Sequence, residues 1–113
     1  MRIAQAEALP SNLTMEAMQI GARLARLRVA RNISQTEAAL RAGISRNTAY
    51  RLEKGDPSIA FGQLLRFLDA IAPGKTLQNF LTEDDSTIAA LEAKERRRRA
   101  RPLTKRERED LDF

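Results

Sequence analysis

The chain has 113 residues, enough for one small domain with extensions, and its net charge of +5 is compatible with nucleic-acid binding without proving it. It contains neither cysteine nor histidine, which excludes disulfides, thiolate and imidazole metal sites, and catalytic triads with a histidine base. Aromatic residues make up only 4% of the chain, so the core must be built from Leu, Ile and Ala, which favours an all-α bundle over a sheet.

The first 14 residues predict an N-terminal arm. Residues 2–9 are compatible with a turn of helix that Pro10 would stop. Thr14 is the expected N-cap of the next helix, which runs to about Asn32 and has apolar residues near helical spacing.

Two short helices joined by a tight turn are predicted between Ser34 and Glu53. Ser34 followed by Glu37 is a capping box, which begins the first helix. Gly43 ends that helix because glycine takes left-handed backbone angles without a Cβ penalty, and Ser45 caps the second helix. The side chains expected to be buried are Ala38, Ala39, Ala42, Ile44, Thr48 or Ala49, and Leu52.

The second of these helices has an unusually polar exposed face. Arg46, Asn47 and Thr48 form its tip, and Tyr50 and Arg51 follow one turn later. A DNA-binding helix-turn-helix consists of these parts in this order: a capped first helix, a glycine turn, and a capped second helix with a polar tip. An ordinary pair of packed helices is the alternative, but it gives no reason for these residues to gather on one face.

Two further helices are predicted after the loop around Pro57. The first runs from about Phe61 to Ala72 and ends at Pro73-Gly74. Its expected apolar stripe consists of Phe61, Leu64, Leu65, Leu68 and Ile71. A short helix containing Leu77, Phe80 and Leu81 then either closes the bundle or forms part of a dimer face. The predicted globular domain is therefore residues 15–82.

Residues 83–113 predict a charged C-terminal tail. Ser86 is the expected cap of a helix that carries Ile88 and Leu91, and a basic run extends from Lys94 to Arg108. The run is a solvated tail, a sequence-independent phosphate contact, or a docking segment for an acidic partner with Leu111 and Phe113 as apolar anchors. The last two interpretations together rank above the first. The candidate contact residues are Arg96, Arg97, Arg98, Arg99 and Arg101.

Residues from about 20 to 81 resemble the Cro/repressor-type (XRE) helix-turn-helix family. The resemblance is carried by Leu24–Arg28, Ile33–Ala39, Gly43–Thr48, Arg51–Gly55 and Leu64–Leu68. It implies a compact five-helix, lambda-repressor-like bundle, with the charged tail as an extension, that acts as a homodimer on palindromic double-stranded DNA. Two departures are Ala38 and Ala49 at positions usually occupied by Leu or Ile, which predict looser packing.

The same resemblance implies roles for individual residues. Gln35 would anchor a phosphate, and Arg46, Asn47 and Arg51 would face the major groove. Arg28 and Glu53 would form an ion pair inside the domain. From the residues themselves, Arg46 is suited to guanine and Asn47 to adenine, whereas we expect Thr48 to pack. The complete predicted DNA-binding set is Gln35, Ser45, Arg46, Asn47, Tyr50 and Arg51.

Another departure from the family pattern lies before the fourth helix. Ala60 stands where a capping serine is common, so the start of that helix is expected to depend on packing or on Ser58. Residues 62–71, followed by the arginine-rich tail, also resemble those of antitoxins encoded with HipA-like kinase toxins, which is a narrower resemblance within the family.

The leading hypothesis is therefore that the chain is a sequence-specific DNA-binding repressor. In this hypothesis it is the antitoxin of a toxin–antitoxin operon, where it represses its own promoter and neutralises a partner toxin. The alternatives are a stand-alone phage- or host-type repressor and, ranked last, RNA binding through the tail. An enzyme is not expected, because no phosphate-cradling glycine loop, metal cluster or activated nucleophile is recognisable. We expect no cofactor, no membrane span, and a location in the bacterial cytoplasm or nucleoid.

Overall fold

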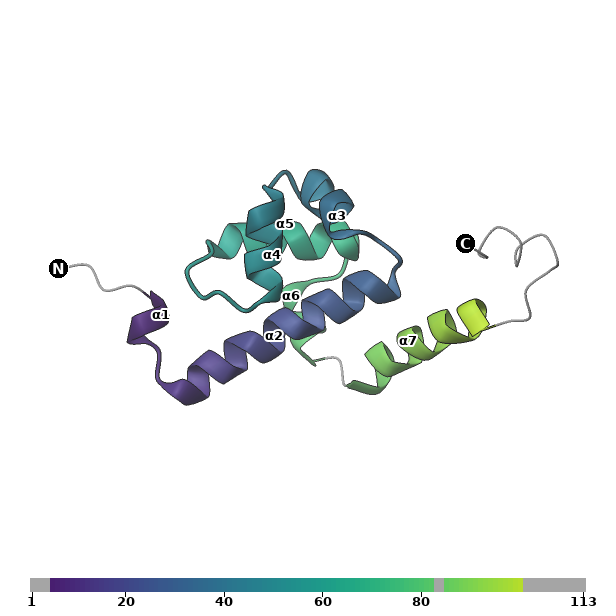
Figure 1. The fold of residues 1–113 in the computed structure, drawn as a ribbon, viewed down its shortest axis with the longest axis horizontal. Helices are drawn as coiled ribbons and strands as arrows, with labels where there is room; N and C mark the ends of the chain where they lie inside the picture. Colours follow the sequence, from purple (N-terminus) through teal and green to yellow (C-terminus); the bar gives the residue numbers. More distant parts are fainter. Residues whose placement is uncertain (1–4, 83–84, 101–113) are drawn as a thin grey trace, which may run out of the picture.

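The computed structural model describes the backbone of residues 5–82 and 85–100, and the side chains of residues 7–82 and 88–98 (Figure 1). Within these ranges the secondary structure is α-helical, as predicted. The helices are α1 (Gln5–Ala8), α2 (Ser11–Ala30), α3 (Gln35–Ala42), α4 (Arg46–Glu53), α5 (Phe61–Ile71), α6 (Leu77–Thr82) and α7 (Asp85–Ala100).

Helices α2 to α6 form the predicted five-helix bundle. The long helix α2 contacts α4 and α5, and α3 packs against both α4 and α5 (Figure 1). Two phenylalanines and four aliphatic side chains fill the centre, and small alanines of α3 and α4 let those two helices approach it closely. The largest fully buried side chains are Leu24, Leu27, Phe67, Leu68, Ile71 and Phe80. This core fixes the orientation of the short helices α3 and α4.

Helix α2 begins and ends earlier than the sequence predicted. Its N-cap is Pro10, whose carbonyl accepts from the backbone N–H groups of Leu13 and Thr14, so Thr14 lies inside the helix and its predicted capping role is wrong. The helix ends at Ala30, because Asn32 takes a left-handed conformation with φ of 59°. Asparagine tolerates this region better than most residues, which allows the chain to turn there.

The predicted caps of the two central helices are confirmed. The Ser34 hydroxyl accepts from the Glu37 N–H at 3.0 Å, and the Ser45 hydroxyl accepts from the Thr48 N–H at 3.0 Å. Gly43 is left-handed, with φ of 69°. A capping box also predicts a bond from the Ser34 backbone N–H to the Glu37 carboxylate. The Glu37 carboxylate instead accepts from Arg41 Nε at 2.9 Å, in an ion pair along α3.

The buried face of α5 differs from the predicted stripe. Phe67 is 0% exposed, whereas Phe61 is 64% exposed and Leu65 is also exposed. Leu64, Phe67, Leu68 and Ile71 share one face at helical spacing, and Phe61 and Leu65 lie beside it. In α6, Phe80 is buried in the core and Leu77 packs against it, whereas Leu81 is exposed, so two of the three predicted residues close the bundle.

The start of α5 does not use Ser58. Ala60 is the N-cap, and its carbonyl accepts from the N–H groups of Gln63 and Leu64. Ser58 is bonded instead to Arg51 and Asp56.

Helix α7 packs against α2, and Figure 1 shows it alongside the C-terminal half of that helix. Ile88 is buried, and Leu91 packs against the main core. The helix already includes Ser86, so the predicted cap at that residue is wrong. Part of the predicted tail thus belongs to the packed structure, while Leu111 and Phe113, the predicted apolar anchors, lie outside the described residues.

Candidate nucleic-acid interface

The exposed face of α4 carries most of the polar side chains that the sequence singled out. Ala49 and Leu52 attach the opposite face of the helix to the core. Arg46, Asn47 and Tyr50 are exposed. The helix therefore offers one apolar side to the bundle and one hydrogen-bonding side to a partner.

Lys54, directly after α4, extends this face, and the sequence interpretation missed it. Its Nζ lies 5.4 Å from the centre of the Tyr50 ring, within the range of a cation–π contact. The contact holds the Tyr50 ring beside the Lys54 ammonium, which adds a positive charge to the face that carries Arg46. The signal in the sequence was the spacing of Asn47, Tyr50 and Lys54, which places them on one helical face.

The tip of α4 is fixed by its cap. Ser45 is exposed, and its hydroxyl donates to Thr48 Oγ1 at 2.9 Å while accepting from the Thr48 N–H. Ala49 is fully buried and provides the close packing, whereas Thr48, which was expected to pack, is only half-buried. Ile44 packs against the core from the turn.

An internal network holds α4 to α2 and α3. Arg28 Nε donates to Glu53 Oε2 at 2.6 Å and Arg28 Nη2 donates to Glu53 Oε1 at 3.1 Å, which is the ion pair that the family resemblance implied. Arg28 Nη1 also donates to the Ile33 carbonyl at 2.8 Å. Gln35 Nε2 donates to Glu53 Oε1 at 3.0 Å. The amide of Gln35 thus braces this pair, and its role as a phosphate anchor stays a prediction.

Arg51 is bonded to the loop that follows α4. Its Nε donates to Asp56 Oδ2 at 2.7 Å, and its Nη2 donates to Ser58 Oγ at 2.7 Å. Bonds from the Ser58 hydroxyl and N–H, and then from Arg51, lower the pKa of Asp56 to about 2. The carboxylate therefore remains ionised at neutral pH. The sequence interpretation placed Arg51 on the reading face but missed its two partners in the loop.

The turn between α3 and α4 has a further support from α5. Arg66 Nη2 donates to the Gly43 carbonyl at 2.8 Å. This bond occupies a carbonyl at the end of α3 that helical hydrogen bonding leaves open. It links the left-handed turn to the helix that packs beneath it.

A family model described as a helix-turn-helix domain matches residues 19–76, about half of the chain. The chain belongs to this helix-turn-helix family. No curated protein and no solved structure matches the chain. A helix-turn-helix domain is a DNA-binding module, and here α3 and α4 are its two characteristic helices. The family assignment marks the chain as a DNA-binding regulator.

The basic helix α7 lies on another side of α2 from the helix-turn-helix pair. Gly21, Leu24 and Arg28 of α2 face α4 and the core, whereas Ala25 and Val29 face α7. Arg96, Arg97 and Arg98 are exposed on α7, and Arg98 Nη2 donates to Glu95 Oε1 at 3.0 Å. The side chain of Arg99 and all of Arg101 lie outside the described residues.

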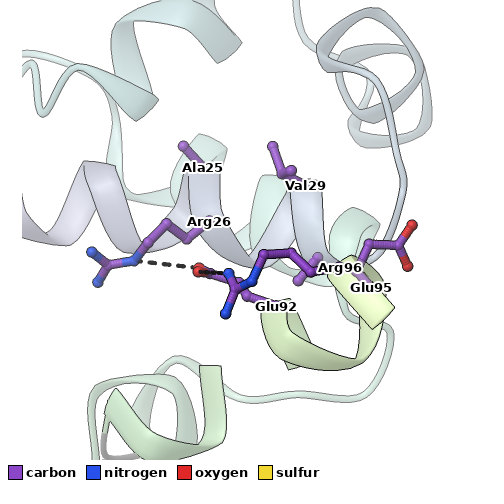
Figure 2. Close-up of a pocket in the computed structure, with 7 residues that line it drawn as sticks. Ala25, Arg26, Val29, Glu92, Glu95 and Arg96 are labelled. Carbon is purple, nitrogen blue, oxygen red and sulfur yellow. Dashed lines mark ion pairs between the residues drawn. The ribbon is translucent and has the colours of Figure 1, made fainter. Parts of the chain in front are cut away.

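A groove of about 390 Å³ lies between the packed helices α2 and α7 and is lined by residues of both. Its floor is apolar, with Ala25 and Val29 among the lining residues. Arg26 Nε from α2 lies 3.9 Å from Glu92 Oε1, and Arg96 Nη1 from α7 lies 3.9 Å from Glu92 Oε2. Figure 2 shows both arginines reaching toward this carboxylate. These long ion pairs of exposed arginines with Glu92 contribute little to stability. The burial of Ile88 attaches α7 more strongly.

Among the described residues, no group of acidic side chains is arranged so that it could hold a metal ion. None of the described helices is both long and apolar enough to cross a membrane.

Proposed function

We propose that this helix-turn-helix protein is a sequence-specific transcriptional repressor without enzymatic activity. It acts in the bacterial cytoplasm and nucleoid, as a homodimer on a palindromic operator. The observation that carries the proposal is the exposed face of α4, where Arg46 and Asn47 stand at the tip of a helix whose other face is fixed in the core. Helix α4 enters the major groove, and α3 lies across the DNA backbone.

The chemistry of the helix tip supports base reading. The guanidinium of Arg46 matches the O6 and N7 acceptors of guanine, and the amide of Asn47 matches the N7 acceptor and N6 donor of adenine. The N-terminus of α4 adds partial positive charge and unpaired N–H groups that favour a nearby phosphate. Tyr50 and Lys54 extend the contact along the groove.

Selection from a pool of randomised duplexes tests the proposal. We expect the full chain to enrich a consensus sequence, and to bind it at least ~1,000-fold more tightly than a scrambled duplex at the same salt concentration. A selection that enriches no duplex sequence would contradict the proposal. Tighter binding to RNA hairpins than to any selected duplex would also contradict it, in favour of RNA binding through α7.

We further propose that the protein is the antitoxin of a toxin–antitoxin operon. The support is the exposed arginines of α7, which lie away from α4 and so leave a second charged surface for a protein such as a HipA-like kinase. Expressed with its neighbouring genes, the chain is expected to co-purify with the product of an adjacent gene, and that product alone should arrest growth. Absence of both results would leave a stand-alone repressor as the function.

A further inference from the structure

The loop after α4 contains a hydrogen-bonded cluster that the proposed function does not by itself require. Asp56 Oδ1 accepts from the Ser58 N–H at 2.9 Å and from the Ser58 hydroxyl at 2.6 Å. The other oxygen, Oδ2, accepts from Arg51 Nε, and Ser58 Oγ accepts from Arg51 Nη2, both at 2.7 Å. The Asp56 N–H in turn donates to the Arg51 carbonyl at 3.0 Å. The cluster thus closes a ring between the last turn of α4 and the loop.

The hydrogen bonds that Arg51 makes in this cluster determine which of its N–H donors remain for a ligand. A guanidinium is planar and has five N–H donors in a fixed fork. The bonds from Nε and Nη2 occupy the side edge of the plane. The end of the plane, formed by Nη1 and the second hydrogen of Nη2, is a two-donor fork of the kind that pairs with guanine O6 and N7.

Arg51 also has the position and exposure that such a contact needs. It lies one helical turn after Asn47 on α4, and its side chain remains 40% exposed although two of its nitrogens are bonded. A long, unrestrained arginine loses much rotamer freedom when it binds, and a restrained one loses less. Preorganisation by the loop therefore favours a defined contact over a diffuse one.

We infer that Asp56 and Ser58 are positioning residues that hold the Arg51 fork for one guanine of the recognised sequence. The inference rests on the proposed function and adds a specificity determinant to it. Asp56 and Ser58 act through Arg51 and need not touch the DNA. The loop between α4 and α5 thereby strengthens a guanine preference that would be weaker if Arg51 were not held by the loop.

The test compares base preferences of the wild-type chain and loop variants. Each protein is offered the wild-type consensus duplex and the three other base pairs at every position. For the wild type we expect one guanine to be preferred by about 5- to 150-fold, and Arg51→Ala to remove that preference. Asp56→Asn and Ser58→Ala should lower it at least ~5-fold at the same position only. Ser58→Thr, which keeps the hydroxyl, should retain it.

The outcomes separate this inference from the proposed function. A wild-type consensus that stays unchanged in Asp56→Asn and Ser58→Ala overturns the positioning role and leaves DNA reading intact. A stronger guanine preference in Asp56→Asn also overturns it, because the loop would then be withholding Arg51. An even loss of affinity at all positions indicates a merely structural role and counts against the inference. No consensus for the wild type overturns both proposals.

Discussion

Replacement of Gly21 by alanine is expected to destabilise the domain by about 2–3 kcal/mol, although alanine is the better helix former. A methyl group at Gly21 would lie 2.6 Å from the Gly55 nitrogen and 2.6 Å from the Leu52 carbonyl oxygen. Both neighbours are backbone atoms, so relief requires α2 to move away from the end of α4. Thermal unfolding should show a midpoint lowered by about 10–20 °C for a domain of this size.

Gly62 provides the matched control for this prediction. It is also a helical glycine, in α5, but a methyl group there would meet nothing within 4 Å. Gly62→Ala should leave stability unchanged or raise it by up to about 1 kcal/mol. Equal midpoints for the Gly21 and Gly62 variants would show that α2 and α4 do not approach each other as closely as described.

Removal of the charge of Glu53 is expected to have the second large effect. The Glu53 side chain is 7% exposed and that of Arg28 is 14% exposed, so Glu53→Gln leaves the Arg28 guanidinium without its counter-charge in a largely buried place. Breaking one partner of such a pair costs about 3–5 kcal/mol. Urea unfolding should report this loss as a lower midpoint with an unchanged slope.

Two comparisons isolate the cause of that loss. Glu37 pairs with Arg41 in α3, but its side chain is 46% exposed, so Glu37→Gln should cost less than about 1 kcal/mol. The double variant Arg28→Met/Glu53→Leu should lose less than Glu53→Gln alone, since neither side chain then leaves a buried charge. Similar losses for Glu37→Gln and Glu53→Gln would contradict the structural importance of the network.

The sequence predicted the features that depend on neighbouring residues. Ser34, Gly43 and Ser45 have the predicted caps and turn because each signal acts within four residues of backbone. The helical nature of α5 and α7 was predicted for the same reason. The exposed positions of Arg46 and Asn47 followed from the periodicity of a short helix with a single apolar side.

Features that depend on tertiary contact were not predicted. The face of α5 was misassigned because Phe61 and Leu65 fit a helical stripe as well as Phe67 does, and only the bundle decides between them. The restriction of Gly21 to glycine arises from the backbone of α4, far along the chain. The bonds of Arg51 to Asp56 and Ser58 were missed because they form only when the loop folds back onto α4.

A binding comparison decides whether the tip of α4 reads DNA sequence. The wild type and Arg46→Ala/Asn47→Ala are titrated with the selected duplex and with a scrambled duplex at one salt concentration. Arg97→Ala, which removes one exposed positive charge from α7, serves as the control. We predict that the α4 variant binds both duplexes equally, with an unchanged unfolding midpoint, while the α7 variant keeps the wild-type preference. A retained preference in the α4 variant would contradict sequence reading by this tip.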